Sequence, residues 1–233
     1  MRLTICAGPA TTGKTSVLRH LIGKLQSGGR RAAFLKIDVQ YAEEDEQLAR
    51  EFGMPTRKVY SGELCPDHCN VMVLGDALDW ARREQCDFLL VETAGLCLRC
   101  SPYVDGGLGI VVLEATSGMN LPLKVGPMLS LADVAVVTKI DRVSQAEREV
   151  FRARIQNAAP GVRIREVNAL YGIGIDPLVD HVLATPEAGA HLLLRGNPPV
   201  GTCTICVGKK EVGWQSHFGV VRPLENQTFY RGE

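Results

Sequence analysis

The sequence lacks an excess of charge of either sign. Lysine plus arginine and aspartate plus glutamate each number 26 among the 233 residues, so the formal net charge is zero. Proteins that bind nucleic acid usually carry a basic field, and disordered tails often carry blocks of like charge. We therefore expect neither a nucleic-acid partner nor a long disordered tail.

Long hydrophobic runs are also absent, although hydrophobic residues make up 45% of the chain. A membrane-spanning helix needs about eighteen or more apolar residues in a row, and no stretch reaches that length. The first apolar run, residues 3–7, begins almost at the N-terminus, which leaves no room for a signal peptide. We expect a cytoplasmic protein with no membrane partner.

A phosphate-binding pattern dominates what is present. Residues 8–15 read GPATTGKT, which fits GxxxxGK[ST], between a short apolar run and a stretch with helical apolar spacing. In this context backbone N–H groups at a helix start bind phosphate oxygens, and glycine permits conformations that a Cβ would obstruct. The residues predicted to contact the nucleotide here are Gly8, Ala10, Thr11, Thr12, Gly13, Lys14, Thr15 and Ser16. Lys14 would supply a charge to the outer phosphates, and Thr15 a hydroxyl ligand for Mg²⁺.

Strand and helix patterns alternate along the rest of the chain. Strands are expected near residues 32–38, 57–60, 87–93, 109–115, 132–138 and 162–167, and helices near residues 42–52, 71–85, 144–159 and 176–184. This alternation predicts an α/β fold with a doubly wound, mostly parallel sheet. In such sheets ligands bind beyond the carboxyl ends of the strands.

The composition changes after Pro186. Residues 187–233 contain a Pro-Pro pair, several glycines and a CxxC pair, and they are too few for an independent core. We predict a nucleotide-binding domain over residues 1–186 and a small cysteine-containing extension over residues 187–233.

Two acids and a glycine follow the predicted core strands. Asp38 and Glu92 stand at strand ends, where one would hold Mg²⁺ and the other would orient or gate the attacking water. Gly95 lies just beyond Glu92, in a loop suited to sensing a terminal phosphate. The alternative is that these acids cap helices or face solvent.

The stretch Thr138-Lys139-Ile140-Asp141 favours guanine as the base. A carboxylate such as that of Asp141 accepts hydrogen bonds from the N1–H and 2-amino groups of guanine, a donor pair that adenine lacks. The stem of Lys139 would lie along the base, and Asn168 with Ala169 would present a backbone amide to the guanine carbonyl. The alternative is a strand end with a solvated acid.

Six of the eight cysteines fall into three close pairs. These pairs, with a histidine inside the first, are Cys65, His68 and Cys69; Cys97 and Cys100; and Cys203 and Cys206. Disulfides are rare in the cytoplasm, so the clustering favours metal or redox chemistry. Thiolates suit Zn²⁺, Ni²⁺ or a [4Fe–4S] cluster. A structural zinc site, or cysteines packed as small apolar residues, are the alternatives.

The order of these motifs resembles a known family. Asp38, the segment SGELC at residues 61–65, ETAG at 92–95, TKID at 138–141, and NA at 168–169 followed by GIGID at 172–176 are similar to the metallochaperone GTPases. These are the nickel-insertion proteins of hydrogenase and urease maturation, HypB and UreG, and the cobalamin-related CobW-like proteins. The resemblance covers about residues 1–185.

The resemblance implies a homodimeric GTPase of the SIMIBI class, in which the nucleotide state controls metal handling. It also implies that Asp38 and Glu92 belong to the magnesium and switch apparatus, with Cys65 as a metal ligand. The nickel proteins often place histidine directly after that cysteine, whereas this chain has Pro66, and a histidine-rich N-terminal extension is absent.

The leading hypothesis is therefore a GTPase that loads a metal ion or cluster into a client metalloenzyme or helps to assemble it. In this hypothesis Lys14, Asp38 and Glu92 carry out hydrolysis, and the paired cysteines bind the metal. The first alternative is an iron–sulfur redox activator that couples nucleotide hydrolysis to electron delivery. The second is a scaffold that binds nucleotide without catalysis.

Overall fold

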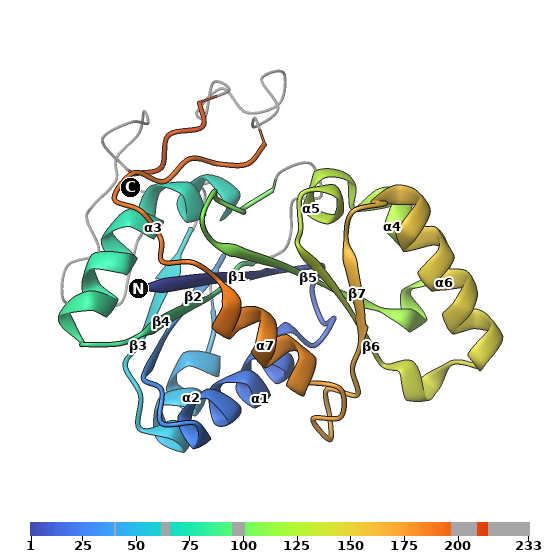
Figure 1. Ribbon diagram of the computed structural model, residues 1–233, viewed down its shortest axis with the longest axis horizontal. Helices are drawn as coiled ribbons and strands as arrows, with labels where there is room; N and C mark the ends of the chain where they lie inside the picture. The colour runs from blue at the N-terminus through green and yellow to red at the C-terminus, as the bar shows by residue number, and fades with distance from the viewer. Residues whose placement is uncertain (40, 62–65, 95–100, 197–208, 214–233) are drawn as a thin grey trace.

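The fold is a single parallel sheet with helices on both faces (Figure 1). The computed structural model describes residues 1–39, 41–61, 66–94, 101–196 and 209–213, apart from the side chains of Asp67 and His68. The seven strands follow the order β3-β2-β4-β1-β5-β6-β7, and every pairing is parallel. This confirms the predicted doubly wound α/β fold.

The strands are β1 (Arg2–Ala7), β2 (Ala32–Asp38), β3 (Thr56–Tyr60), β4 (Phe88–Glu92), β5 (Leu108–Glu114), β6 (Val134–Thr138) and β7 (Arg163–Glu166). The helices are α1 (Lys14–Ser27), α2 (Glu44–Phe52), α3 (Pro66–Arg83), α4 (Leu121–Lys124), α5 (Gly126–Ser130), α6 (Gln145–Ala158) and α7 (Asp176–Ala184). Short 3₁₀ turns follow β5 (Ala115–Ser117) and β6 (Ile140–Arg142).

Alternating residues of the strands build two separate hydrophobic clusters. One cluster packs α1, α2 and α7 against one face of the sheet, and the other packs α3, α5 and α6 against the opposite face (Figure 1). Central strands such as β4 are buried on both faces, which is why they appear in the sequence as continuous apolar runs. The sheet is therefore a rigid base for the loops at its carboxyl edge.

Local sequence signals account for the starts of α6 and α3. Ser144 and Glu147 form a capping box at the start of α6, each side chain bonding the other's backbone N–H. The prediction that α3 begins near residue 71 was wrong, because the helix begins at Pro66. Proline is tolerated in the first turn of a helix, where no intrahelical partner is needed for its nitrogen. His68 and Cys69 consequently lie in the first turns of α3.

The described part of the extension packs on the main core. Residues 192–194 pair antiparallel with residues 210–212 through hydrogen bonds of 2.8 and 3.2 Å. Leu192 and Leu194 belong to the same hydrophobic cluster as α3. Among the described residues, no helix is both long and apolar enough to cross a membrane. The domain boundary at residue 186 stays a prediction.

Candidate functional site: a nucleotide site at the carboxyl edge of the sheet

The loop between β1 and α1 has the backbone conformation that phosphate binding requires. Gly8 and Gly13 have φ values of 147° and 90°, and Thr11 has 63°. A Cβ added to Gly8 would lie 2.3 Å from the carbonyl oxygen of Val112 in β5. Only glycine fits at this close approach between the loop and the sheet.

The Lys14 side chain folds back onto the backbone of the loop. Its ammonium donates to the carbonyl oxygens of Gly8 and Pro9 at 3.0 Å each, and the residue is only 6% exposed. Burial lowers the pKa of Lys14, and the nearby Glu92 carboxylate opposes that shift. The ammonium is thus held against the loop, where its charge faces the space framed by the backbone.

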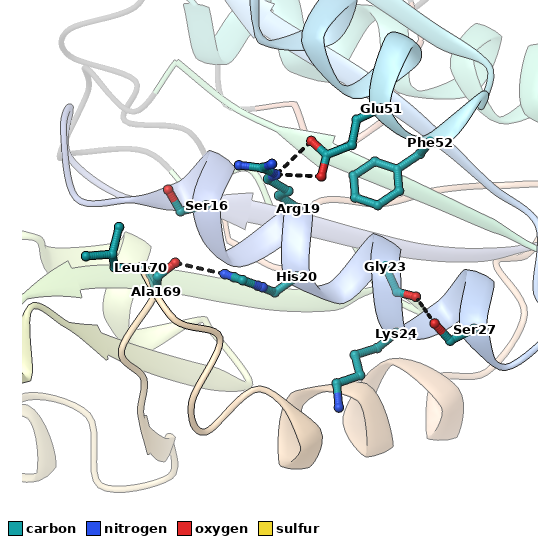
Figure 2. Close-up of a pocket in the computed structure, with 10 residues that line it drawn as sticks. All are labelled: Ser16, Arg19, His20, Gly23, Lys24, Ser27, Glu51, Phe52, Ala169 and Leu170. Carbon is teal, nitrogen blue, oxygen red and sulfur yellow. Dashed lines mark hydrogen bonds and ion pairs between the residues drawn. The ribbon is translucent and has the colours of Figure 1, made fainter.

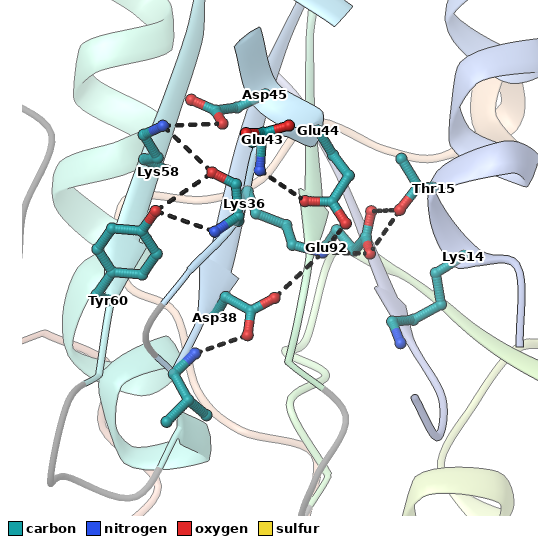
Figure 3. Close-up of polar contacts among 12 residues, drawn as sticks. Lys14, Thr15, Lys36, Asp38, Glu43, Glu44, Asp45, Lys58, Tyr60 and Glu92 are labelled. Atoms are coloured by element: carbon teal, nitrogen blue, oxygen red, sulfur yellow. Dashed lines mark hydrogen bonds and ion pairs between the residues drawn. The ribbon is translucent and has the colours of Figure 1, made fainter. Parts of the chain in front are cut away.

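Thr15 and Glu92 are joined directly. The Thr15 hydroxyl lies 3.0 and 2.9 Å from the two oxygens of the Glu92 carboxylate and donates to them (Figure 3). Glu92 ends β4 and is 2% exposed. A hydroxyl that donates its hydrogen to a carboxylate keeps its oxygen lone pairs for a cation. The pair therefore fits a Mg²⁺ site, with Thr15 as the ligand and Glu92 as the acid beside it.

Asp38 belongs to the same cluster through Lys36. The Lys36 ammonium lies 2.7 Å from Glu92, 3.4 Å from Asp38 and 3.7 Å from Glu44 of α2 (Figure 3). Burial disfavours the charged form of Lys36, but the Glu92, Glu44 and Asp38 carboxylates raise its pKa overall. Asp38 also accepts a 2.7 Å hydrogen bond from the N–H of Val39. The two predicted acids therefore share one lysine.

The other side of the loop meets the end of β6. The Thr138 hydroxyl donates to the carbonyl oxygen of Thr12 at 2.6 Å. Lys139 has a positive φ of 54° and its ammonium pairs with Glu114 at the end of β5. Burial tends to raise the pKa of Glu114, but hydrogen bonds from Lys139, Ser117 and Thr116 lower it. Asp141 lies in the exposed turn that follows.

The second predicted base loop lies beside the phosphate loop. The Ala169 Cβ and the Thr138 Cγ2 each lie 3.9 Å from a Cβ built on Gly13. His20 of α1 bonds the Ala169 carbonyl oxygen at 3.0 Å, and the Asn168 side chain accepts from the backbone N–H groups of residues 170 and 171. The fold thus gathers the phosphate loop and both predicted base segments at one edge.

Two cavities lie along α1 beside this edge. One, of about 620 Å³, runs from Thr15 and Ser16 to Glu44 and Glu51. The other, of about 520 Å³, is shown in Figure 2, where His20 points to the Ala169 carbonyl oxygen and Arg19 pairs with Glu51. Ser16 lines both cavities. The nucleotide edge is therefore open to solvent along α1.

Most of the predicted thiolate ligands lie outside the residues that the structure describes. Gly95, Cys65, Cys97, Cys100, Cys203 and Cys206 lie outside the described residues, and of His68 only the backbone is described. Cys69 is described and is 0% exposed, in the hydrophobic cluster under α3. Within the described ranges no group of three or more His, Cys, Asp or Glu side chains has metal-site geometry. The metal ligands remain a prediction.

Sequence reasoning missed Lys36, Glu44, Glu114 and His20 as neighbours of the site. Lys36 had a visible signal, since a lysine inside the apolar run of residues 32–38 must find a carboxylate if it is buried. Glu114 had a weaker signal, the same strand-end position as Asp38 and Glu92. Nothing local marks Glu44 or His20, which reach the site from helices.

Known proteins similar to this chain include a domain family and several relatives. The model of the CobW/HypB/UreG nucleotide-binding domain matches residues 2–166. The uncharacterised protein MJ0120 of Methanocaldococcus jannaschii is 42% identical over 235 residues, covering 100% of both chains. The urease accessory protein UreG 2 of Methylobacterium radiotolerans is 29% identical over 186 residues, covering 75% of this chain and 89% of that protein.

The fold has a counterpart among solved structures. The crystal structure of HypB from Helicobacter pylori in complex with nickel matches with a TM-score of 0.63 at 19% identity, covering 81% of this chain and 91% of that one. At this identity the likeness concerns the fold. Together with the domain match, it leads to one conclusion: the chain belongs to the CobW/HypB/UreG family of P-loop, nucleotide-dependent metallochaperones.

Proposed function

We propose that this chain is a GTP-hydrolysing metallochaperone that inserts a metal ion or metal cluster into a client metalloenzyme, or helps to assemble it. The observation that carries the proposal is the hydrogen bond between Thr15 and Glu92. The Glu92 carboxylate is hydrogen-bonded to Thr15, the proposed magnesium ligand. Cys97 follows Glu92 in the chain by only five positions. In the chain, the acid beside the proposed magnesium ligand is therefore only five positions from a proposed thiol ligand.

The site geometry supports the proposed hydrolytic roles. Lys14 binds and orients the outer phosphates. Glu92, which accepts the Thr15 hydroxyl, and Asp38, which shares Lys36 with Glu92, position water in the reaction. Bound Mg²⁺ would neutralise charge on the phosphate oxygens. Asp141 reads the guanine edge, and the stem of Lys139 lies along the base.

The described neighbours of the cysteine segments support a shared metal site. The Asn70 amide in α3 donates to the carbonyl oxygen of Pro102 at 3.4 Å, and Val104 pairs antiparallel with Leu194 of the extension. Residue 213 donates to the Val71 carbonyl oxygen at 3.0 Å. Described residues one or two positions from the first two cysteine pairs, and seven to nine positions from the third, therefore lie in or next to contacting segments.

We assign the metal to soft ligands from these segments. The proposed ligands are Cys65, His68, Cys69, Cys97, Cys100, Cys203 and Cys206. Thiolates with one imidazole suit Zn²⁺, Ni²⁺ or a [4Fe–4S] cluster. The proposed partners are a second copy of the chain and the client enzyme or another maturation factor.

The test is a measurement of metal affinity in the two nucleotide states. Zn²⁺ and Ni²⁺ affinities are measured by chelator competition with GDP and with a non-hydrolysable GTP analogue. A coupling of about 2–3 kcal/mol would change the affinity roughly 30- to 150-fold. Identical affinities in the two states would overturn the coupled mechanism.

A variant pair makes the test specific. Cys97→Ser with Cys100→Ser should abolish the nucleotide dependence of metal binding and leave GDP affinity unchanged. Cys86→Ser is the matched control, since Cys86 is buried between α3 and β4 and burial raises its pKa, which disfavours the thiolate. Anaerobic purification followed by metal analysis identifies the metal, and visible absorption that dithionite bleaches would indicate the iron–sulfur redox activator instead.

A further inference from the structure

Lys36 occupies a fixed place in a polar row on three neighbouring strands, β3, β2 and β4. In the strand register, Lys36 of β2 lies between Glu92 of β4 on one side and Lys58 of β3 on the other. Glu92 in turn is paired with Cys6 of β1. Residues in register on neighbouring parallel strands point to the same face of the sheet. Backbone pairing alone therefore directs the Lys36 side chain toward Glu92.

The Lys36 ammonium is the cation between three acids. It is 4% exposed and reaches Glu92, Asp38 and Glu44 at 2.7, 3.4 and 3.7 Å. Glu92 therefore has two partners, Lys36 at one oxygen and the Thr15 hydroxyl at both (Figure 3). A buried carboxylate held by a charge-assisted hydrogen bond has little freedom to rotate. The orientation that receives Thr15 thus depends on Lys36.

We propose that Lys36 is a positioning residue for nucleotide hydrolysis, holding the Glu92 carboxylate in the orientation that accepts the Thr15 hydroxyl and so aligning the magnesium ligand with the phosphate loop. The inference rests on the proposed GTPase activity. It assigns to β2 a role beyond supplying Asp38 at its end.

A neighbouring lysine supplies a matched control. Lys58 is also buried, lies one strand away in the same row, and pairs with Asp45 at 3.4 Å in the first turn of α2 (Figure 3). It also pairs with Glu46 of the same turn at 2.6 Å. The ion pairs of Lys58 do not include Glu92. Substitution of Lys58 removes a buried cation from the same region without touching the phosphate site.

The experiment compares Lys36→Met, Lys36→Arg and Lys58→Met in the full-length protein. Steady-state GTP hydrolysis should show kcat reduced at least about 10-fold in K36M, with KM changed less than about 3-fold. Arginine keeps the charge and reaches the same acids, so K36R should recover most of kcat. K58M should keep kcat although its thermal stability falls, and a purely structural role of Lys36 would make K36M behave in the same way.

Binding of fluorescent GDP with and without Mg²⁺ gives a second readout. If Lys36 only neutralises charge, removing it leaves Asp38, Glu44 and Glu92 without their shared cation, and these carboxylates should bind Mg²⁺ more strongly. If Lys36 instead aligns Glu92 with Thr15, the factor by which Mg²⁺ tightens GDP binding should fall about 10-fold in K36M. An unchanged or larger factor would overturn the inference.

A double variant tests whether Lys36 acts through Glu92. In the Glu92→Gln background, K36M should have no further effect on kcat or on the factor by which Mg²⁺ tightens GDP binding. Lys36 acts through the charge of the Glu92 carboxylate, which Glu92→Gln has already removed. Fully additive effects would count against the inference. If the wild-type chain hydrolyses no GTP, the proposed function fails, and the Mg²⁺ factor in GDP binding still decides the role of Lys36.

Discussion

The Thr138 hydroxyl donates a 2.6 Å hydrogen bond to the carbonyl oxygen of Thr12, which ties the end of β6 to the phosphate loop. Thr138→Val keeps the side-chain shape but leaves the Thr12 carbonyl without this donor, at a cost of about 1–2 kcal/mol. We expect GDP and GTP affinities to fall roughly 5- to 20-fold, measured by fluorescent nucleotide titration. Thr138→Ser should stay close to wild type.

Thr185→Val is the control for that prediction. The Thr185 hydroxyl is also mostly buried and donates to a carbonyl, that of His181, at 2.8 Å, but it lies at the end of α7. This variant should lose a similar amount of stability without a change in nucleotide affinity. Equal affinity losses in both variants would mean that the Thr138 bond contributes only general stability.

Gly8→Ala should remove nucleotide binding altogether. The added Cβ would stand 2.3 Å from the Val112 carbonyl oxygen, so the loop or β5 must shift. Gly29→Ala is a control for backbone strain without a clash. Gly29 also has a positive φ, 71°, but no atom of the described residues lies within 4 Å of an added Cβ. Gly29→Ala should cost only about 1 kcal/mol of folding free energy and keep full GDP affinity. Retained GDP binding by Gly8→Ala would contradict the proposed site.

Base selectivity is predicted to depend on Asp141. Asp141→Asn replaces an acceptor-only carboxylate with an amide that also donates, so it no longer complements the two donors of guanine. We expect GTP affinity to fall about 10- to 100-fold, and xanthosine triphosphate, whose base has a carbonyl in place of the 2-amino group, to bind better than GTP. Asp79→Asn, on the exposed face of α3, should change neither affinity. Unchanged GTP affinity in Asp141→Asn would remove the basis for assigning guanine.

The parts of the site that could be predicted from sequence are those encoded within a few residues. The phosphate loop is one such part, because GxxxxGK[ST] itself specifies the glycines, Lys14 and Thr15. The strand ends at Asp38, Glu92 and Thr138 follow from apolar runs that stop at a polar residue. The capping box of Ser144 and Glu147 is also local.

The parts that could not be predicted depend on register between distant segments. Lys36 meets Glu92 because β2 and β4 are neighbours in the sheet although α2, β3 and α3 lie between them in the chain. The helix predicted to begin near residue 71 begins at Pro66, because proline is tolerated at the first helical position. The contact between His20 and Ala169 joins residues 149 positions apart.

His181 should make stability depend on pH in the weakly acidic range. Burial, with Arg163 and Arg165 nearby, lowers the pKa of His181 from its ordinary value of 6.5. The unfolded chain therefore binds a proton more readily than the folded one, so the free energy of unfolding decreases as the pH falls through and below that value. The melting temperature should fall between about pH 7.5 and about pH 5.5 more in the wild type than in His181→Gln. Parallel pH curves for the two proteins would contradict this role.

Arg195 should hold the extension to the sheet. Its guanidinium is mostly buried, donates to the carbonyl oxygens of Val104 and Leu131 at 3.2 and 3.0 Å, and pairs with Asp133 at 2.8 Å. Arg195→Met leaves these carbonyls and the Asp133 carboxylate without their partner, which should cost about 2–4 kcal/mol of folding free energy.

We expect limited proteolysis of Arg195→Met to cleave near residue 190 at least about 10-fold faster than wild type, because local opening is governed by the free energy that the arginine contributes. Arg19→Met is the control, since Arg19 makes an exposed ion pair with Glu51 that contributes at most about 1 kcal/mol. GDP affinity should be unchanged in Arg195→Met, because none of its partners belongs to the phosphate or base loops. Loss of GDP binding, or cleavage no faster than in Arg19→Met, would show that the extension is held by other contacts.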